Sequence, residues 1–177
     1  MPRRESGSPG FLACRSPSGP FRIRFDGIQI TGVDLQHPAV RQDSSRLTFP
    51  LRQNSARLLP PTLRRAVRLL DLYFSGGRDP FLDDACFSTA GLTPFTVNVI
   101  LGTRRIPPGD VATYTEFSRM LGLAPSFRRA VGGALGRNPF PIFYPCHRVV
   151  GNQTPGGFSS GLAWKHRLLR HEGVTLG

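Results

Sequence analysis

Residues 21–30 alternate between apolar and polar side chains, with one interruption at Asp26-Gly27. Phe21-Arg22-Ile23-Arg24-Phe25 has the period of two that is typical of a strand with one buried face, and Ile28-Gln29-Ile30 resumes it. Asp-Gly tolerates the positive φ angles of a type I′ turn, so the pattern predicts a β-hairpin. Val33-Asp34-Leu35 either extends the second strand or begins a third.

The rest of the N-terminal half contains one clear helix. Between Thr62 and Phe74 apolar residues recur every three or four positions, and Gly76-Gly77 ends the run. Residues 36–60 have no clear period and several prolines, which predicts a loop with one weak strand at 46–49. Residues 78–93 are of mixed composition with further Pro and Gly, and we interpret them as a linker.

The C-terminal half predicts a series of short helices. Thr93 can cap a helix that begins at Pro94 and continues towards Pro107. Thr113-Tyr114-Thr115-Glu116 fits a capping box, for a helix that stops at Gly122. A further helix starts at Pro125-Ser126 with Arg128 and Arg129 in its first turn, and a final one covers 162–170. Two short helices joined by about four residues resemble a helix-turn-helix.

Composition adds a strong positive charge. The chain has 177 residues, with 23 Lys+Arg against 11 Asp+Glu and a net charge of +12, and all the basic residues except Lys165 are arginine. Such a balance favours a polyanionic partner, although a merely soluble arginine-rich surface accounts for it equally well. No apolar run has signal-peptide or membrane-spanning length, so we expect an intracellular protein without a membrane anchor.

The three cysteines cannot all pair, and none has a partner at CxxC spacing, which argues against a disulfide framework and a metal site. One of them lies in Pro145-Cys146-His147-Arg148-Val149, where a thiol stands beside an imidazole. A thiolate is a strong nucleophile and needs a base or a positive charge nearby. Adjacent side chains in an extended segment point to opposite faces, so a water or a turn at Pro145 has to connect the two groups.

Residues 93–173 resemble the C-terminal domain of O6-alkylguanine-DNA alkyltransferases, also called methylated-DNA–protein-cysteine methyltransferases. The matching motifs occur in the order and at the spacing of that family: Gly109-Asp110-Val111 before Tyr114, Arg129-Ala130-Val131-Gly132-Gly133-Ala134, Asn138-Pro139, Pro145-Cys146-His147-Arg148-Val149-Val150, Gly161-Leu162-Ala163-Trp164-Lys165 and His171-Glu172-Gly173. The N-terminal half matches weakly, through Ser16-Pro17-Ser18-Gly19 and Leu72-Tyr73-Phe74.

The resemblance implies an α+β fold of two domains. Residues 1–90 would form a small sheet-plus-helix domain of RNase H-like type, with roughly the first 12 residues mobile because they are rich in Ser, Gly, Pro and Arg. Residues 91–177 would form a mainly helical domain, similar to a winged helix-turn-helix, that binds DNA and accepts the alkyl group.

The implied reaction transfers an alkyl group from guanine O6 irreversibly to Cys146, once per molecule. His147 would take the thiol proton through a bound water, Glu172 would orient the imidazole, and Asn138 would support the cysteine turn. Taken alone, Cys146 is better interpreted as a small buried hydrophobe and His147 as a surface residue, since most cysteines are inert. The Pro-Cys-His-Arg-Val context and Glu172 reverse that interpretation.

An alkylated guanine inside the stack must be extruded before a thiol can reach it. By resemblance, Arg129 fills the vacated space and Arg128 contacts phosphate. Tyr114 crowds the rotating phosphate and either protonates or polarises the flipped base at N3. The alternatives are that Arg129 also contacts only phosphate and that Tyr114 is a half-buried core aromatic.

The resemblance also implies a substrate pocket. Pro141 and Phe158 would form its wall, the carbonyls of Cys146 and Val149 would accept from the guanine amino group, and the Ser159 N–H would face O6. Lys165 would support the loop, the alternative being a solvated helix lysine. Phe158 replaces a tyrosine of some relatives, and Ser160 replaces a glycine, which can narrow the entry for bulky alkyl groups.

We expect no cofactor and no structural zinc, because Cys14, His37 and Cys86 do not form a convincing ligand set. The expected partner is double-stranded DNA with O6-alkylguanine, or with O4-alkylthymine, and the expected state is a monomer. The location would be cytoplasmic and nucleoid-associated in a prokaryote and nuclear in a eukaryote.

Three other functions compete with alkyl transfer. A non-catalytic alkyltransferase-like protein would bind damaged DNA, but such proteins usually have tryptophan at the acceptor position, where this chain has Cys146. A Cys-His hydrolase would need a histidine distant in sequence and an oxyanion site. A transcription regulator would need an additional DNA-binding domain, for which the chain has no room.

Overall fold

The computed structural model describes residues 9–36, 59–76 and 79–176. The chain has a mixed α+β architecture and divides into two compact units, Met1–Ser88 and Thr89–Gly177. In the described ranges no helix has the length and apolar character needed to cross a membrane.

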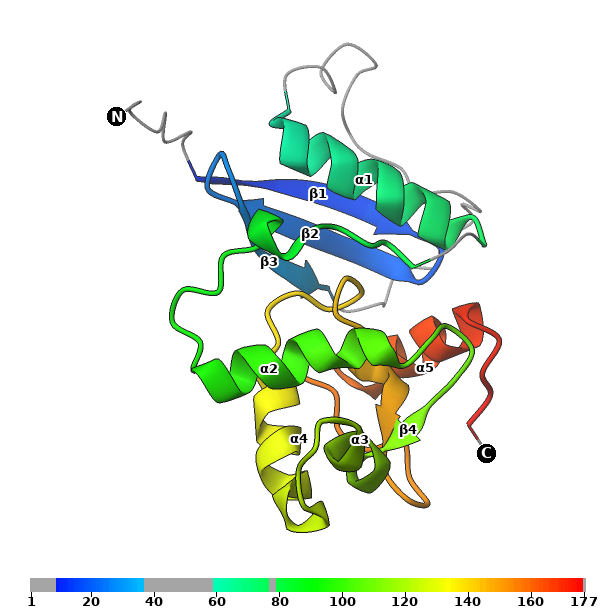
Figure 1. The fold of residues 1–177 in the computed structure, drawn as a ribbon. Helices are drawn as coiled ribbons and strands as arrows, with labels where there is room; N and C mark the ends of the chain where they lie inside the picture. Colours follow the sequence, from blue (N-terminus) through cyan, green and yellow to red (C-terminus); the bar gives the residue numbers. More distant parts are fainter. Residues whose placement is uncertain (1–8, 37–58, 77–78, 177) are drawn as a thin grey trace. The chain divides into compact units, whose positions relative to one another are not determined.

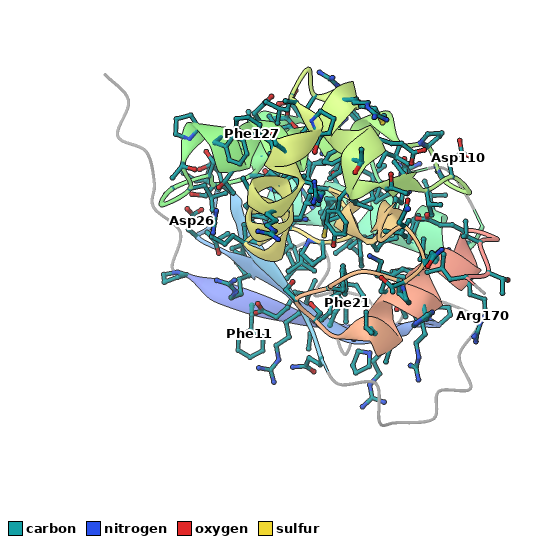
Figure 2. The ribbon with its side chains drawn as sticks, turned by 90° about the horizontal axis from the view of Figure 1, so that it is seen from below. Phe11, Phe21, Asp26, Asp110, Phe127 and Arg170 are labelled. Atoms are coloured by element: carbon teal, nitrogen blue, oxygen red, sulfur yellow. The ribbon has the colours of Figure 1, made fainter. Side chains whose placement is uncertain are left out.

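The N-terminal unit is a three-stranded antiparallel sheet in the order β1-β2-β3, with β1 Gly10–Ser16, β2 Gly19–Phe25 and β3 Ile30–Leu35. Helix α1, Pro61–Phe74, lies along one face of the sheet (Figure 1). The rings of Phe21 and Phe74 join the two layers, with centroids 6.1 Å apart. Phe21 is fully buried, whereas Phe11 of β1 points outward (Figure 2) and is 60% exposed.

The predicted hairpin is confirmed, but its connection is longer than two residues. The carboxylate of Asp26 accepts hydrogen bonds from the backbone N–H groups of Ile28 at 3.1 Å and Gln29 at 2.8 Å. Ile28 therefore belongs to the loop, and the second strand begins at Ile30 and includes Val33-Asp34-Leu35. A carboxylate that holds two backbone donors stabilises a longer turn than the Asp-Gly pair alone suggests.

Two segments of the N-terminal unit are more ordered than expected, although the boundary between the two units, after Ser88, falls within the predicted linker. Residues 10–12, expected to be mobile, begin β1, which pairs along its whole length with β2. The predicted linker is ordered from Leu82 to Ser88, because Leu82 and Phe87 are buried and the Ser88 N–H donates to the Ile30 carbonyl at 2.9 Å. A 3₁₀ turn, Asp84–Cys86, lies between them. The weak strand at 46–49 and His37 lie outside the described residues.

The C-terminal unit contains the predicted helices as α2 Pro94–Gly102, α3 Tyr114–Met120, α4 Arg128–Gly136 and α5 Leu162–His171 (Figure 1). Both predicted caps are confirmed: the Thr93 hydroxyl accepts from the Thr96 N–H, and Thr113 and Glu116 form the complete capping box. Helix α2 ends earlier than predicted, where a 3₁₀ turn, Thr103–Arg105, follows. A 3₁₀ turn, Pro125–Phe127, precedes α4, and its Phe127 lies at the surface (Figure 2).

Two strands of two residues each, which the sequence did not predict, bring distant segments of this unit together. β4, Ala112–Thr113, pairs in parallel with β5, Val149–Val150. Tyr114 follows β4 directly, and Cys146 lies three residues before the start of β5. The core beneath them includes Val99 of α2, Phe117 of α3 and Val131 of α4. This pairing places the start of α3 beside the Cys-His segment.

Candidate active site

The cysteine lies on a tight turn inside the C-terminal unit. Cys146–Arg148 form a 3₁₀ turn, and all residues from 140 to 150 are buried. The Cys146 N–H donates to the Tyr144 carbonyl at 2.7 Å, and the Arg148 N–H donates to the Pro145 carbonyl at 3.0 Å. The turn at Pro145 that the sequence left open is therefore present, and the segment around the thiol is not an extended strand.

Asn138 connects the backbone of this turn to the thiol. Its Nδ2 donates to the Tyr144 carbonyl at 2.9 Å and to Cys146 Sγ at 3.1 Å, while its Oδ1 accepts from the Phe140 N–H at 2.9 Å. Burial raises the pKa of the Cys146 thiol, and the Asn138 hydrogen bond and the positive charge of Lys165 act in the opposite direction. Both of these neighbours favour the thiolate form.

His147 does not hydrogen-bond to the adjacent thiol. Its Nε2 is 2.9 Å from Glu172 Oε1, and both side chains are almost completely inaccessible. Its Nδ1 is buried and has no hydrogen-bond partner among the described residues. Since the Glu172 carboxylate can only accept, the ring proton lies on Nε2 and the Nδ1 lone pair is available.

Arg148 completes a buried ion pair that sequence reasoning missed. Its Nε donates to Glu172 Oε2 at 2.9 Å, its Nη2 donates to Oε1 at 2.8 Å, and its Nη1 donates to the Ile106 carbonyl at 2.7 Å. Burial alone would raise the pKa of Glu172, but the hydrogen bonds from His147 and Arg148 outweigh it and hold that pKa well below its usual range. The available signal was a charged residue inside an otherwise apolar segment next to Cys-His.

Burial lowers the pKa of His147, and the attraction of Glu172 opposes this only in part. The positive charges of Arg148 and Lys165 lower it further. At neutral pH the imidazole is therefore uncharged and can accept a proton.

Lys165, the one lysine of the chain, is fully buried and is not a solvated helix residue. Its Nζ donates to the Val149 carbonyl at 2.5 Å and to the Gly157 carbonyl at 3.4 Å. Burial lowers its pKa to about 8, against some compensation from Cys146. The side chain joins α5 to β5 and to the glycine-rich loop.

A pocket of about 110 Å³ opens beside the thiol. Its lining residues are Tyr114, Gly132, Leu135, Gly136, Cys146, Gly157, Phe158 and Ser159. The structure thus brings Tyr114, Phe158 and Ser159 to Cys146, whereas Pro141, Val149 and Lys165 are buried and do not line the pocket. Sequence reasoning missed Gly132 and Gly136, although two glycines four positions apart leave a bare strip on one helix face.

Tyr114 is half-buried at the first position of α3. Burial raises the pKa of its hydroxyl, while a hydrogen bond with the Gly157 backbone acts against this. The phenol therefore keeps its proton at neutral pH. An ideal Cβ on Gly132 would lie 3.5 Å from the Tyr114 ring, an ordinary van der Waals contact, so this part of α4 packs beside the ring.

Arg128 and Arg129 are exposed in the first turn of α4. Arg128 also lines an open groove with Tyr114, Arg119 and Asn152, next to the pocket. Among the described residues no group of three His, Cys, Asp or Glu side chains is placed to hold a metal ion.

Comparison with known proteins gives a consistent assignment. Residues 94–174 match the family model described as 6-O-methylguanine DNA methyltransferase, DNA binding domain. The methylated-DNA–protein-cysteine methyltransferase of Saccharolobus islandicus is 40% identical over 107 residues, which cover 60% of this chain and 67% of that protein. The protein of the same name from Thermococcus kodakarensis is 45% identical over 98 residues, 52% of this chain and 55% of the relative. The match therefore spans little more than half of the latter's length.

Solved structures resemble more of the chain. Mycobacterium tuberculosis O6-methylguanine methyltransferase superposes with a TM-score of 0.67 at 29% identity, over 93% of this chain and 92% of that one. The Mycobacterium tuberculosis protein OGT in complex with DNA gives a TM-score of 0.68 at 30% identity, over 90% of each chain.

Proposed function

The chain belongs to the O6-methylguanine-DNA methyltransferase family, and on this basis we propose that it repairs DNA by transferring the alkyl group of O6-alkylguanine to Cys146. The observation that carries the proposal is the position of the thiol. Cys146 lies at a pocket lined by Tyr114, and its Sγ accepts a hydrogen bond from Asn138 Nδ2 at 3.1 Å. The next residue, His147, is hydrogen-bonded to Glu172.

The reaction is a displacement at the alkyl carbon. The Cys146 thiol proton passes to Nδ1 of His147 through a water, and the thiolate forms a C–S bond as the C–O6 bond breaks. The electron pair of that bond goes to the guanine oxygen, and a proton returned to the base restores neutral guanine. The thioether is stable, so each molecule acts once.

Tyr114 would assist the departure of the guanine. Its raised pKa favours a hydroxyl that donates a hydrogen bond to the base at N3 over one that surrenders its proton completely. Of the two roles considered for this residue, polarisation is therefore preferred to full protonation. The carbonyl of Val149 already accepts from Lys165 and would offer its second lone pair to the guanine amino group.

We also infer that α3 and α4 act as a helix-turn-helix within a winged domain, with α4 facing duplex DNA. Arg129 would fill the space of the extruded nucleotide, and Arg128, beside the groove near Tyr114, would contact phosphate. The small glycine side of α4 would then face the flipped base. The same proposal includes four further points. The N-terminal unit would be RNase H-like and the protein would act as a monomer. O4-alkylthymine would be a second substrate, and the protein would be located with the cellular DNA.

The main competing function is that of an alkyltransferase-like protein, which binds the lesion without reacting. Cys146 argues against it, since the acceptor atom is present at the pocket. A Cys-His hydrolase is less consistent with the geometry, because Nδ1 of His147 makes no hydrogen bond to the Cys146 thiol and the sequence suggests no oxyanion site.

Incubation with duplex DNA containing O6-methylguanine should add one methyl group, about 14 Da, to the peptide that contains Cys146. Cys146→Ala should bind the same DNA and gain no mass, and Cys86→Ala, which alters another thiol, should react like the wild type. An unchanged intact mass, or a methyl group on Cys14 or Cys86, would contradict the proposal.

A further inference from the structure

Arg148 contacts both oxygens of the Glu172 carboxylate, which orients the proposed base His147. Its Nε and Nη2 form a two-pronged contact with Glu172 Oε2 and Oε1 at 2.9 and 2.8 Å, while Nη1 is anchored to the Ile106 carbonyl at 2.7 Å. The Arg148 and Glu172 side chains are 0% and 2% exposed. An arginine fork of this kind fixes a carboxylate in both position and orientation, which a lysine could not do.

The same oxygen serves two donors. Glu172 Oε1 accepts from Arg148 Nη2 at 2.8 Å and from His147 Nε2 at 2.9 Å. With His147 alone, the buried carboxylate would attract a second proton to the ring and favour imidazolium. The Arg148 charge offsets that of Glu172, so the carboxylate can hold the Nε2 proton without stabilising a charged ring.

The charged groups that face His147 come from two elements. Arg148 and the Cys146 thiol belong to the same turn as His147, and Lys165 and Glu172 come from α5 and its end. Arg148 and Lys165 disfavour imidazolium, and Glu172 favours it. Among these, Arg148 is the one that shares hydrogen bonds with the carboxylate, so its removal changes both the geometry and the charge balance.

We propose that Arg148 is a positioning residue for the reaction: it clamps Glu172 and thereby keeps the His147 ring neutral, with its proton on Nε2 and Nδ1 directed to serve as base. The inference rests on the proposed function for its consequence in catalysis. Its claim about the protonation of His147 holds in the DNA-free protein and can be tested there separately.

The test compares Arg148→Met and Arg148→Lys with the control Arg170→Met. The control removes an exposed arginine from the last turn of α5, the helix whose C-cap residue is Glu172. Nitrogen-15 NMR of the His147 ring, recorded against pH on the DNA-free full chain, reports its tautomer and its titration. The wild type and Arg170→Met should show a neutral Nε2–H ring at neutral pH. In Arg148→Met the titration of His147 should move upward by about one pH unit or more.

The methylation rate on O6-methylguanine duplex is measured over the same pH range. The acid limb of the rate profile should shift upward in Arg148→Met, while Arg148→Lys should lower the rate at all pH values with a smaller shift. If Arg148→Met does not fold, the double variant Arg148→Met/Glu172→Gln removes both charges together and should show a neutral ring without a fixed tautomer. A folded Arg148→Met, or that double variant, with the tautomer and titration of the wild type would overturn the inference. A shifted titration in Arg148→Met, together with a wild type that transfers no methyl group, would instead contradict the proposed function.

Discussion

The environment of single side chains decides the chemistry of this site. Cys146 and His147 are neighbours in sequence, yet in the 3₁₀ turn the imidazole hydrogen-bonds to Glu172 and the thiol hydrogen-bonds to Asn138. The two side chains therefore have different partners and do not hydrogen-bond to each other. One prediction for a single side chain concerns Lys165, the buried lysine whose charge acts on the thiol.

Lys165→Met should alter how stability depends on pH. The pKa of Lys165 falls from 10.5 to about 8 on folding, so between these values the unfolded chain binds more protons than the folded one. This group therefore makes the free energy of unfolding rise with pH through that window, because stability increases wherever the unfolded state holds the extra proton. The variant lacks the increase, and the wild type should gain stability relative to it from about pH 8 to 10.5.

Urea unfolding at a series of pH values measures this difference. Cys14, whose pKa burial raises to about 12, lowers stability as pH rises above 9.0, but it is present in both proteins and cancels. Arg170→Met on the same helix is the control and should track the wild type. A stability difference between wild type and Lys165→Met that stays constant with pH would contradict the assigned burial of the charge.

Much of the site was predictable from the sequence because its residues lie in motifs that occur in the order and at the spacing of a known family. The resemblance named Tyr114 and Ser159, and both line the pocket with Cys146. The Arg148–Glu172 clamp was not predicted, since 24 positions separate the two residues and no local pattern reports a long-range pair. Gly132 and Gly136 were missed for a similar reason: a glycine has no side chain whose chemistry would point to a pocket.

At the scale of elements, helix boundaries were predicted best where a cap has its own sequence signature. Thr93 and Thr113 mark the starts of α2 and α3 correctly, because a threonine hydroxyl before a helix satisfies an otherwise unpaired N–H. The two-residue strands β4 and β5 could not be found in this way. Their pairing depends on the fold that brings Ala112 to Val149, and two residues are too short for a periodic pattern.

The capping box of α3 should affect both stability and reaction. Thr113→Ala removes the hydroxyl that accepts from the Glu116 N–H, and should cost about 1 kcal/mol of unfolding free energy. Because Tyr114 is the next residue, the methyl-transfer rate should fall as well. Denaturant unfolding and single-turnover kinetics measure the two effects.

Thr89→Ala, at an exposed threonine outside the helices, is the control for this prediction and should change neither quantity. In Thr113→Ala/Glu116→Ala the losses should be less than additive, since both side chains belong to one box. Full additivity would mean that the two caps act independently.

At the scale of the whole molecule, the proposed function gives different roles to the net charge of +12 and to the site on the C-terminal unit. A broad positive charge would draw the protein to any DNA, while the pocket would select the lesion after the base is extruded. Order in the N-terminal unit was only partly predictable, since the burial of Leu82 and Phe87 depends on a sheet formed much earlier in the chain.

Variants of the two adjacent arginines of α4 should distinguish general DNA binding from base extrusion. Arg128→Ala should weaken binding to undamaged duplex and reduce by about one the slope of log affinity against log salt, because one phosphate contact is lost. Arg129→Ala should leave that slope nearly unchanged but slow methyl transfer from duplex DNA much more than from free O6-methylguanine base, which needs no flipping. Arg137→Ala, at the other end of α4, is the matched control for both measurements.

The comparison distinguishes the inserted arginine from a phosphate-binding one. If Arg129→Ala lowered the salt slope like Arg128→Ala and slowed transfer from duplex and from free base equally, both residues would be phosphate contacts. The space left by the flipped base would then have to be filled by another side chain of the first turn of α4 or of the 3₁₀ turn before it. The exposed Phe127, two residues before Arg129, is an aromatic able to stack there, and Phe127→Ala would then show the duplex-specific loss.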